Sequence, residues 1–109
     1  MLETHIKFGE VHNLTYHVGL SDEHVSFQNI FSTDNGGVSL VGFKAGQKLD
    51  THMAPAEVMV TVLEGEIDFF MHDKPYILHA GDFLLMGADV PHSVYAKTDA
   101  KVMLVKVKP

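Results

Sequence analysis

The sequence contains no cysteine and no arginine among its 109 residues. Without cysteine, disulfide bonds cannot hold the fold together, and zinc–thiolate sites and cysteine nucleophiles are excluded. Without arginine, the chain cannot form the bidentate clamps that hold phosphate and carboxylate groups in many enzymes. These absences argue against nucleotide-sugar epimerases and 2-oxoglutarate oxygenases, whose sites are built on such clamps.

The chain also lacks long apolar stretches and excess positive charge. No run approaches the 18 apolar residues of a membrane span, and Met1–His5 has no basic region leading into an apolar run, as a signal peptide would. The formal net charge of −6 disfavours nucleic acid as a partner, because phosphates require a basic surface. We therefore expect a cytoplasmic protein with neither a membrane nor a nucleic-acid partner.

What is present is typical of one globular domain over residues 1–109. Hydrophobic residues make up 46% and charged residues 20% of the chain, a balance that distinguishes it from disordered sequences. No linker, low-complexity segment or internal repeat divides it.

Apolar residues recur with the period of β-strands, and turn signals such as Asp34-Asn35-Gly36-Gly37 separate them at roughly ten-residue intervals. The predicted strands cover about residues 14–18, 25–31, 38–43, 58–63, 67–71, 76–78, 83–86, 92–96 and 102–107. Residues 45–56 are polar and contain Gly46 and Pro55, which predicts a loop. The pattern indicates an all-β sandwich or barrel without any helix longer than about two turns.

Several predicted strands are apolar on both faces. Val58, Val60 and Val62 share one face, while Met59 and Leu63 occupy the other. A strand with one solvated face should alternate more strictly, so something must cover the second face. We predict a homodimer, to which the N-terminal strands, about Leu14 to Phe31, contribute.

Two segments carry a resemblance to a known family. Residues 46–66 read GQKLDTHMAPAEVMVTVLEGE, and residues 81–93 read GDFLLMGADVPHS. They resemble the two motifs of the cupins, the small double-stranded jelly rolls of the RmlC-like type, and place the motif core at about residues 46–94. The resemblance implies an antiparallel jelly-roll β-barrel, in a subgroup of unassigned small cupins with His-x-x-Pro in the first motif.

The same resemblance implies a depleted metal site. Cupins usually hold a metal with two histidines and a carboxylate from the first motif and one histidine from the second. His52 and His92 match the first and last of these positions, whereas Ala54 and Val58 stand at the other two. Two imidazoles alone would hold a divalent ion such as Zn, Fe, Ni or Mn weakly.

Glu57 is the candidate to replace the missing carboxylate. With His52 and His92 it would complete a two-histidine, one-carboxylate set. Strand alternation opposes this, because Glu57 points outward if Val58 points inward, unless Pro55 and Ala56 turn the chain. Tyr95 could supply a proton-transfer hydroxyl near His92, but it has the opposite parity on its strand.

Two functions remain open. The first is a cupin that binds a small molecule in its barrel, with at most a weak metal site; the candidate ligand-binding residues are His52, Glu57, Val58, His92 and Tyr95. The second is a metal-dependent oxygenase, isomerase or lyase acting inside the barrel. The lost ligand positions favour the first function, and the retained histidines favour the second.

Overall fold

The computed structural model describes all 109 residues as nine strands and one short 3-10 helix. The elements are η1 (Leu14–His17), β1 (Ser26–Thr33), β2 (Gly36–Phe43), β3 (Lys48–His52), β4 (Glu57–Glu64), β5 (Glu66–Met71), β6 (Lys74–His79), β7 (Phe83–Met86), β8 (His92–Ala96) and β9 (Ala100–Val107). No helix has the length and the apolar character needed to cross a membrane.

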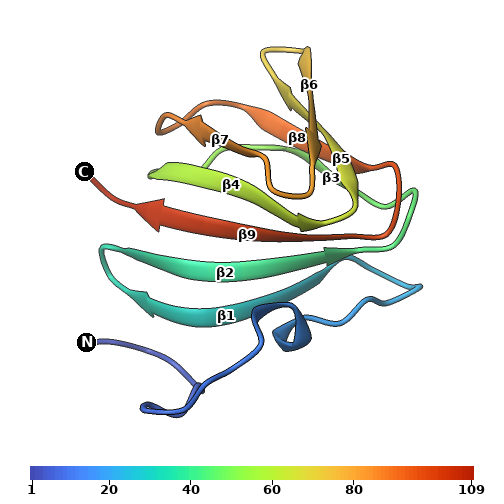
Figure 1. Cartoon of the computed structure of the whole chain (residues 1–109). Coiled ribbons are helices and arrows are strands. Elements are labelled where there is room, and N and C mark those ends of the chain that lie inside the picture. The colour runs from blue at the N-terminus through green and yellow to red at the C-terminus, as the bar shows by residue number, and fades with distance from the viewer.

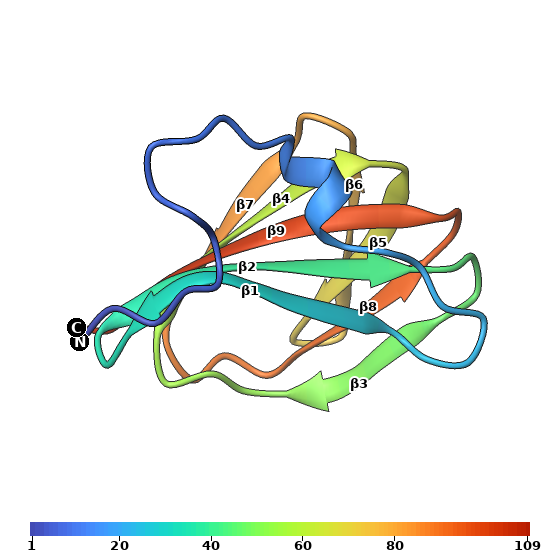
Figure 2. The same cartoon turned by 90° about the horizontal axis from the view of Figure 1, so that it is seen from below.

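The strands form two antiparallel sheets that pack against each other (Figures 1 and 2). The first sheet has the order β1-β2-β9-β4-β7, and the second has the order β3-β8-β5-β6. Both orders join strands that are distant in the sequence, as a jelly roll requires. The predicted all-β, antiparallel jelly-roll fold is confirmed.

Strand alternation places the core between the sheets. In β4 the side chains of Val58, Val60 and Val62 are buried, while their neighbours are more exposed. These valines pack with Ile67 and Phe69 of β5 in one cluster of buried residues. Burying each valine contributes about 1.5 kcal/mol or more to stability.

The prediction of a strand over residues 14–18 is wrong. Residues Leu14–His17 form η1, because the side chain of Asn13 accepts a hydrogen bond from the Thr15 backbone N–H (3.2 Å) and caps the turn. The following segment crosses the outer face of the first sheet (Figure 2), where Val18 is buried over Gly42. A side chain at Gly42 would collide with the Gly19 carbonyl, so the glycine allows this close approach.

The prediction of a continuous loop over residues 45–56 is also wrong. β3 lies within it and pairs with β8, joining Leu49 to Val94 and His52 to His92 in register. Only one residue of β3, Leu49, packs against the core, so the local pattern is weak. The strand exists because β8 offers it backbone partners.

Candidate functional site

A cavity of about 210 Å³ lies between the two sheets. Thirteen of its 17 lining residues are hydrophobic, and they come from both sheets. The polar side chains in its wall belong to His52, His92 and Lys106. Such a chamber, mostly apolar with a few polar groups, has the character of a small-molecule site.

The two histidines lie side by side on the inner face of the second sheet. They are direct partners in the β3–β8 ladder, and their ring centroids are 4.1 Å apart at an interplanar angle of 58°. His92 is buried, with 7% of its surface exposed, whereas His52 is exposed. The structure therefore brings together the two histidines that the sequence singled out.

Backbone carbonyls fix the orientation of both rings. The Nδ1–H of His52 donates to the Asp50 carbonyl (2.8 Å), and the Nδ1–H of His92 donates to the Val90 carbonyl (2.9 Å). A carbonyl oxygen can only accept, so the ring hydrogen sits on Nδ1 in each case. In the neutral form each Nε2 is then a hydrogen-bond acceptor without a partner in the chain.

Burial sets the protonation state of His92. Desolvation lowers its pKa below the usual value of 6.5, and the electrostatic effects of His52 and Lys106 lower it further. The hydrogen bond to Val90 acts in the opposite direction. Phe69 stacks on the ring, with centroids 5.5 Å apart and an interplanar angle of 16°. Burial against an apolar wall therefore favours the neutral form of His92.

All four positions that match the cupin ligands line this cavity, including Ala54 and Val58. Neither of those side chains can donate to a metal, and no group of three or more histidine, aspartate and glutamate side chains is placed to hold an ion. The wall instead adds the cationic side chain of Lys106. These residues do not fit the usual cupin metal.

Glu57 and Tyr95 are not brought to the histidine pair. Glu57 is exposed and lies in a shallow groove with Met59 and Leu85, on the outer face of the first sheet. Tyr95 is 41% exposed and, by alternation with Val94 and Ala96, points away from the core. Pro55 and Ala56 therefore do not turn the chain so that the Glu57 carboxylate points into the cavity. Val58, the remaining candidate, does line the cavity.

Lys106 is the site residue that sequence reasoning missed. It follows Val102 and Leu104 at two-residue intervals along β9, and all three line the cavity. In register it lies opposite Val58 of β4. The strand predicted over residues 102–107 already includes Lys106, and its alternation with Val102 and Leu104 is the signal that places Lys106 on the inner face.

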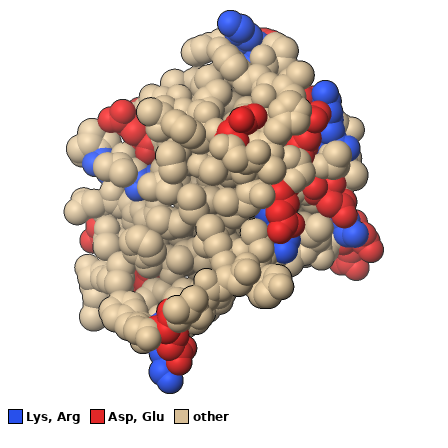
Figure 3. Space-filling model, in the orientation of Figure 1, with Lys and Arg blue, Asp and Glu red and all other residues tan.

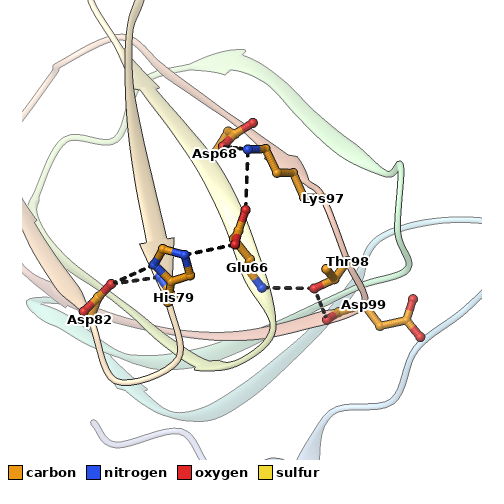
Figure 4. A network of polar contacts seen from close by, with 7 residues as sticks. All are labelled: Glu66, Asp68, His79, Asp82, Lys97, Thr98 and Asp99. Carbon is orange, nitrogen blue, oxygen red and sulfur yellow. Dashed lines mark hydrogen bonds and ion pairs between the residues drawn. The ribbon is translucent and has the colours of Figure 1, made fainter.

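A second polar cluster lies outside the cavity (Figure 4). The side chain of Lys97 pairs with Asp68 (3.4 Å) and Glu66 (3.5 Å), and Glu66 also contacts His79 (3.0 Å). The carboxylate of Asp68, followed by that of Glu66, raises the pKa of Lys97 against the opposing effect of desolvation. Because every cation in it already has an acidic partner, this network ties together β5, β6 and the turn after β8 rather than offering a binding site.

Comparison with known proteins places this geometry in a family. The model of the cupin domain matches residues 39–108. A conserved protein of unknown function from Streptococcus pyogenes superposes with a TM-score of 0.87 at 27% identity, covering 95% of this chain and 91% of the other. No curated protein sequence matches the chain.

Two further solved structures share the fold. An RmlC-like cupin from Desulfovibrio desulfuricans is 31% identical, with a TM-score of 0.80 over 90% of this chain and 95% of the other. A cupin superfamily protein from Desulfitobacterium hafniense has a TM-score of 0.89 over 100% of this chain and 99% of the other, at 17% identity. The last likeness concerns the fold alone.

Proposed function

Because the chain belongs to the cupin family, we propose that it binds a small, mostly apolar molecule in its barrel, at the end marked by His52 and His92. The observation that carries this proposal is the cavity of about 210 Å³ with its apolar wall and the two oriented imidazoles. An apolar cavity of about 150 Å³ is known to accept benzene, so a ligand of roughly seven or eight non-hydrogen atoms fits here.

A neutral probe of this size tests the proposal. We expect 3-methylbutanamide, titrated into the protein, to shift the methyl NMR signals of Val58, Val94 and Leu104, which line the cavity, in a saturable manner. The methyl signals of Leu85 and Val107, which lie in the groove on the outer face, should not move.

The matched pair of variants is Ala54→Leu, which narrows the cavity, and Ala45→Leu, which changes an exposed residue outside it. The first should abolish the shifts and the second should leave them unchanged. Shifts that persist in Ala54→Leu, or that are absent from the wild type, contradict the proposal.

The alternative function is a metal-dependent enzyme of the oxygenase, isomerase or lyase type. The observation in its favour is that both Nε2 atoms are free and the two rings are adjacent. Catalytic metal sites generally use three protein ligands, however, and the chain supplies two here. We therefore propose that any ion is held weakly, is removed by chelator and is released as the pH falls toward about 6.

Restoring one lost ligand tests whether a third donor is enough for the site to bind a metal ion tightly. Ala54 stands at a lost histidine position and lines the cavity. Ala54→His should raise the affinity for zinc by at least about 10- to 100-fold. Residues that only hydrogen-bond to a metal ligand already contribute this much, and a direct ligand should contribute no less. Elemental analysis after dialysis, with Ala45→His as the control, measures this. Stoichiometric metal that survives chelator in the wild type would instead support the enzyme.

We also propose a homodimer, although only Phe31 of the segment that the sequence suggested lies in its surface. The N-terminal segment covers the outer face of the five-stranded sheet at β2, where Leu40 and Val18 are buried. The uncovered part is an apolar row across the sheet, which we call the outer row. In strand order it consists of Phe31, Val38, Val105, Met59 and Leu85.

The outer row is suited to a second copy of the chain. Figure 3 shows the middle of this face free of lysine, aspartate and glutamate side chains, which gather around its margin. Leu85 is 71% exposed, and Phe83 beside it is 62% exposed. A two-fold axis would bring this row onto itself, which is the self-complementary contact that closed dimers use.

The cytoplasm remains the expected compartment.

A further inference from the structure

Lys106 faces the histidine pair from the opposite sheet. Its strand, β9, belongs to the five-stranded sheet, whereas His52 and His92 lie on the four-stranded sheet. All three side chains line one cavity. Lys106 is exposed, so the cavity is open to solvent at the end that this side chain lines.

The charge of Lys106 has no acidic partner. Lys44 and Lys97 form ion pairs with aspartate or glutamate, but Lys106 forms none, and no acidic residue lines the cavity. The chain as a whole carries a formal charge of −6, so this end of the cavity is a local positive site on a negative protein. Its electrostatic effect on His92, whose pKa it helps to lower, indicates that the charge is felt within the site.

The polar groups in the cavity wall favour an anionic ligand over a metal cation. An ammonium group repels a divalent cation and donates strong, charge-assisted hydrogen bonds to a carboxylate. The neutral imidazoles present acceptor nitrogens, which are complementary to a hydroxyl or amide N–H donor. The remaining wall is apolar.

We infer that the cavity takes a small organic acid, with its carboxylate on Lys106, a hydroxyl group donating to His52 or His92, and a short apolar body in the barrel. This inference rests on the proposed small-molecule function and names its ligand class. Hydroxy acids of about eight non-hydrogen atoms match the cavity size.

Three probes of similar size separate the contributions: 2-hydroxy-3-methylbutanoate, 3-methylbutanoate and the neutral 3-methylbutanamide. Each is titrated into the protein at about pH 8, where the acids are ionised, while the methyl signals of the cavity residues are followed. We expect the hydroxy acid to bind most tightly and the amide most weakly. A hydrogen bond to a charged group should make the acids bind about 10- to 100-fold more tightly than the amide.

Lys106→Met keeps the apolar stem and removes the charge. It should reduce the affinity for both acids to that of the amide, and Lys106→Arg should restore most of the difference. Lys108→Met is the control, since it removes the same charge two residues along the chain from a position outside the cavity wall. His52→Leu should abolish the preference for the hydroxy acid over 3-methylbutanoate.

The outcomes are distinguishable. Binding of all three probes with equal affinity, unchanged in Lys106→Met, overturns the inference and leaves the proposed small-molecule function standing. Loss of acid binding in Lys108→Met to the same degree as in Lys106→Met also overturns it, because the effect would then be one of net charge. An absence of cavity shifts with every probe overturns both.

Discussion

His92 shows how one position changes its role when its neighbours change. Its ring is held by Val90, stacked on Phe69 and paired with His52, so it is oriented as a metal ligand would be. At the two other ligand positions, however, Ala54 and Val58 add apolar surface to the cavity. We propose that the same histidine then serves as a hydrogen-bond acceptor at the edge of an apolar cavity.

The lowered pKa of His92 predicts a specific dependence of stability on pH. In the unfolded chain this histidine gains a proton near pH 6.5, whereas in the folded protein it does so only at a lower pH. Stability from its neutral form is therefore complete above about pH 6.5 and is lost as the pH falls toward the folded pKa. Each tenfold difference in proton affinity corresponds to about 1.4 kcal/mol.

We expect the free energy of unfolding to fall more steeply between about pH 7 and pH 5 in the wild type than in His92→Gln, which cannot titrate. Urea denaturation in the presence of chelator measures the two slopes. His24→Gln, at an exposed position, is the control and should follow the wild type. Parallel curves for wild type and His92→Gln would show that His92 is not protected from protonation.

At the scale of elements, the turn between β4 and β5 shows how a tight connection fixes the barrel. Gly65 has φ +85°, and a Cβ there would lie 2.1 Å from the Asp99 carbonyl oxygen. The next residue, Glu66, donates its backbone N–H to Thr98 Oγ1 (3.0 Å), as Figure 4 shows. The turn before β5 and the turn before β9 are thus pressed together, which requires glycine.

Gly65→Ala should therefore lower the free energy of unfolding by more than the cost of placing alanine at a positive φ, because its Cβ would also collide with the chain at Asp99. Gly81→Ala is the matched control, because Gly81 has φ +93° but nothing within 4 Å of the added Cβ. The control should cost about 1–2 kcal/mol, and Gly65→Ala clearly more, as measured by the urea midpoint. Equal losses would mean that the chain around Asp99 yields without strain.

At the scale of the molecule, two large surfaces differ in character. The exposed side of the four-stranded sheet carries the Lys97 network, whereas the outer row of the five-stranded sheet is apolar. Large uncovered apolar faces are unusual on monomers. The fold leaves this face open because the N-terminal segment lies on the β1 side of the sheet (Figure 1) and contacts β9 only near its start, where Lys101 donates a hydrogen bond to the Thr15 carbonyl (2.7 Å).

Light scattering at micromolar concentration should give twice the 12.1 kDa mass of one chain. In a dimer with two-fold symmetry, Leu85→Lys buries one added charge from each copy in the interface. It should therefore convert the dimer to monomer. Ile77→Lys is the control, because Ile77 is 55% exposed on β6 of the other sheet. A wild-type mass near that of one chain, or dissociation by both variants alike, would rule out the outer row as the interface.

The sequence by itself determined the strands that are short apolar runs between turn signals, and the two motifs that flank the site. Residues 58–63, 83–86 and 92–96 predict β4, β7 and β8, because short runs rich in apolar residues and bounded by turn signals are typical of buried strands. The match of His52 and His92 to cupin ligand positions likewise follows from local spacing. Both kinds of signal lie within a few neighbouring residues.

Only the tertiary structure decided the features that depend on distant partners. β3 has one core residue and forms because β8 lies beside it. Alternation within β4 and β9 sets which residues share a face, but the packing of Val58 and Val102 in the core decides that Glu57 faces outward and Lys106 lines the cavity. The charge of the site, from which we infer the class of ligand, is therefore set by contacts between residues far apart in the chain.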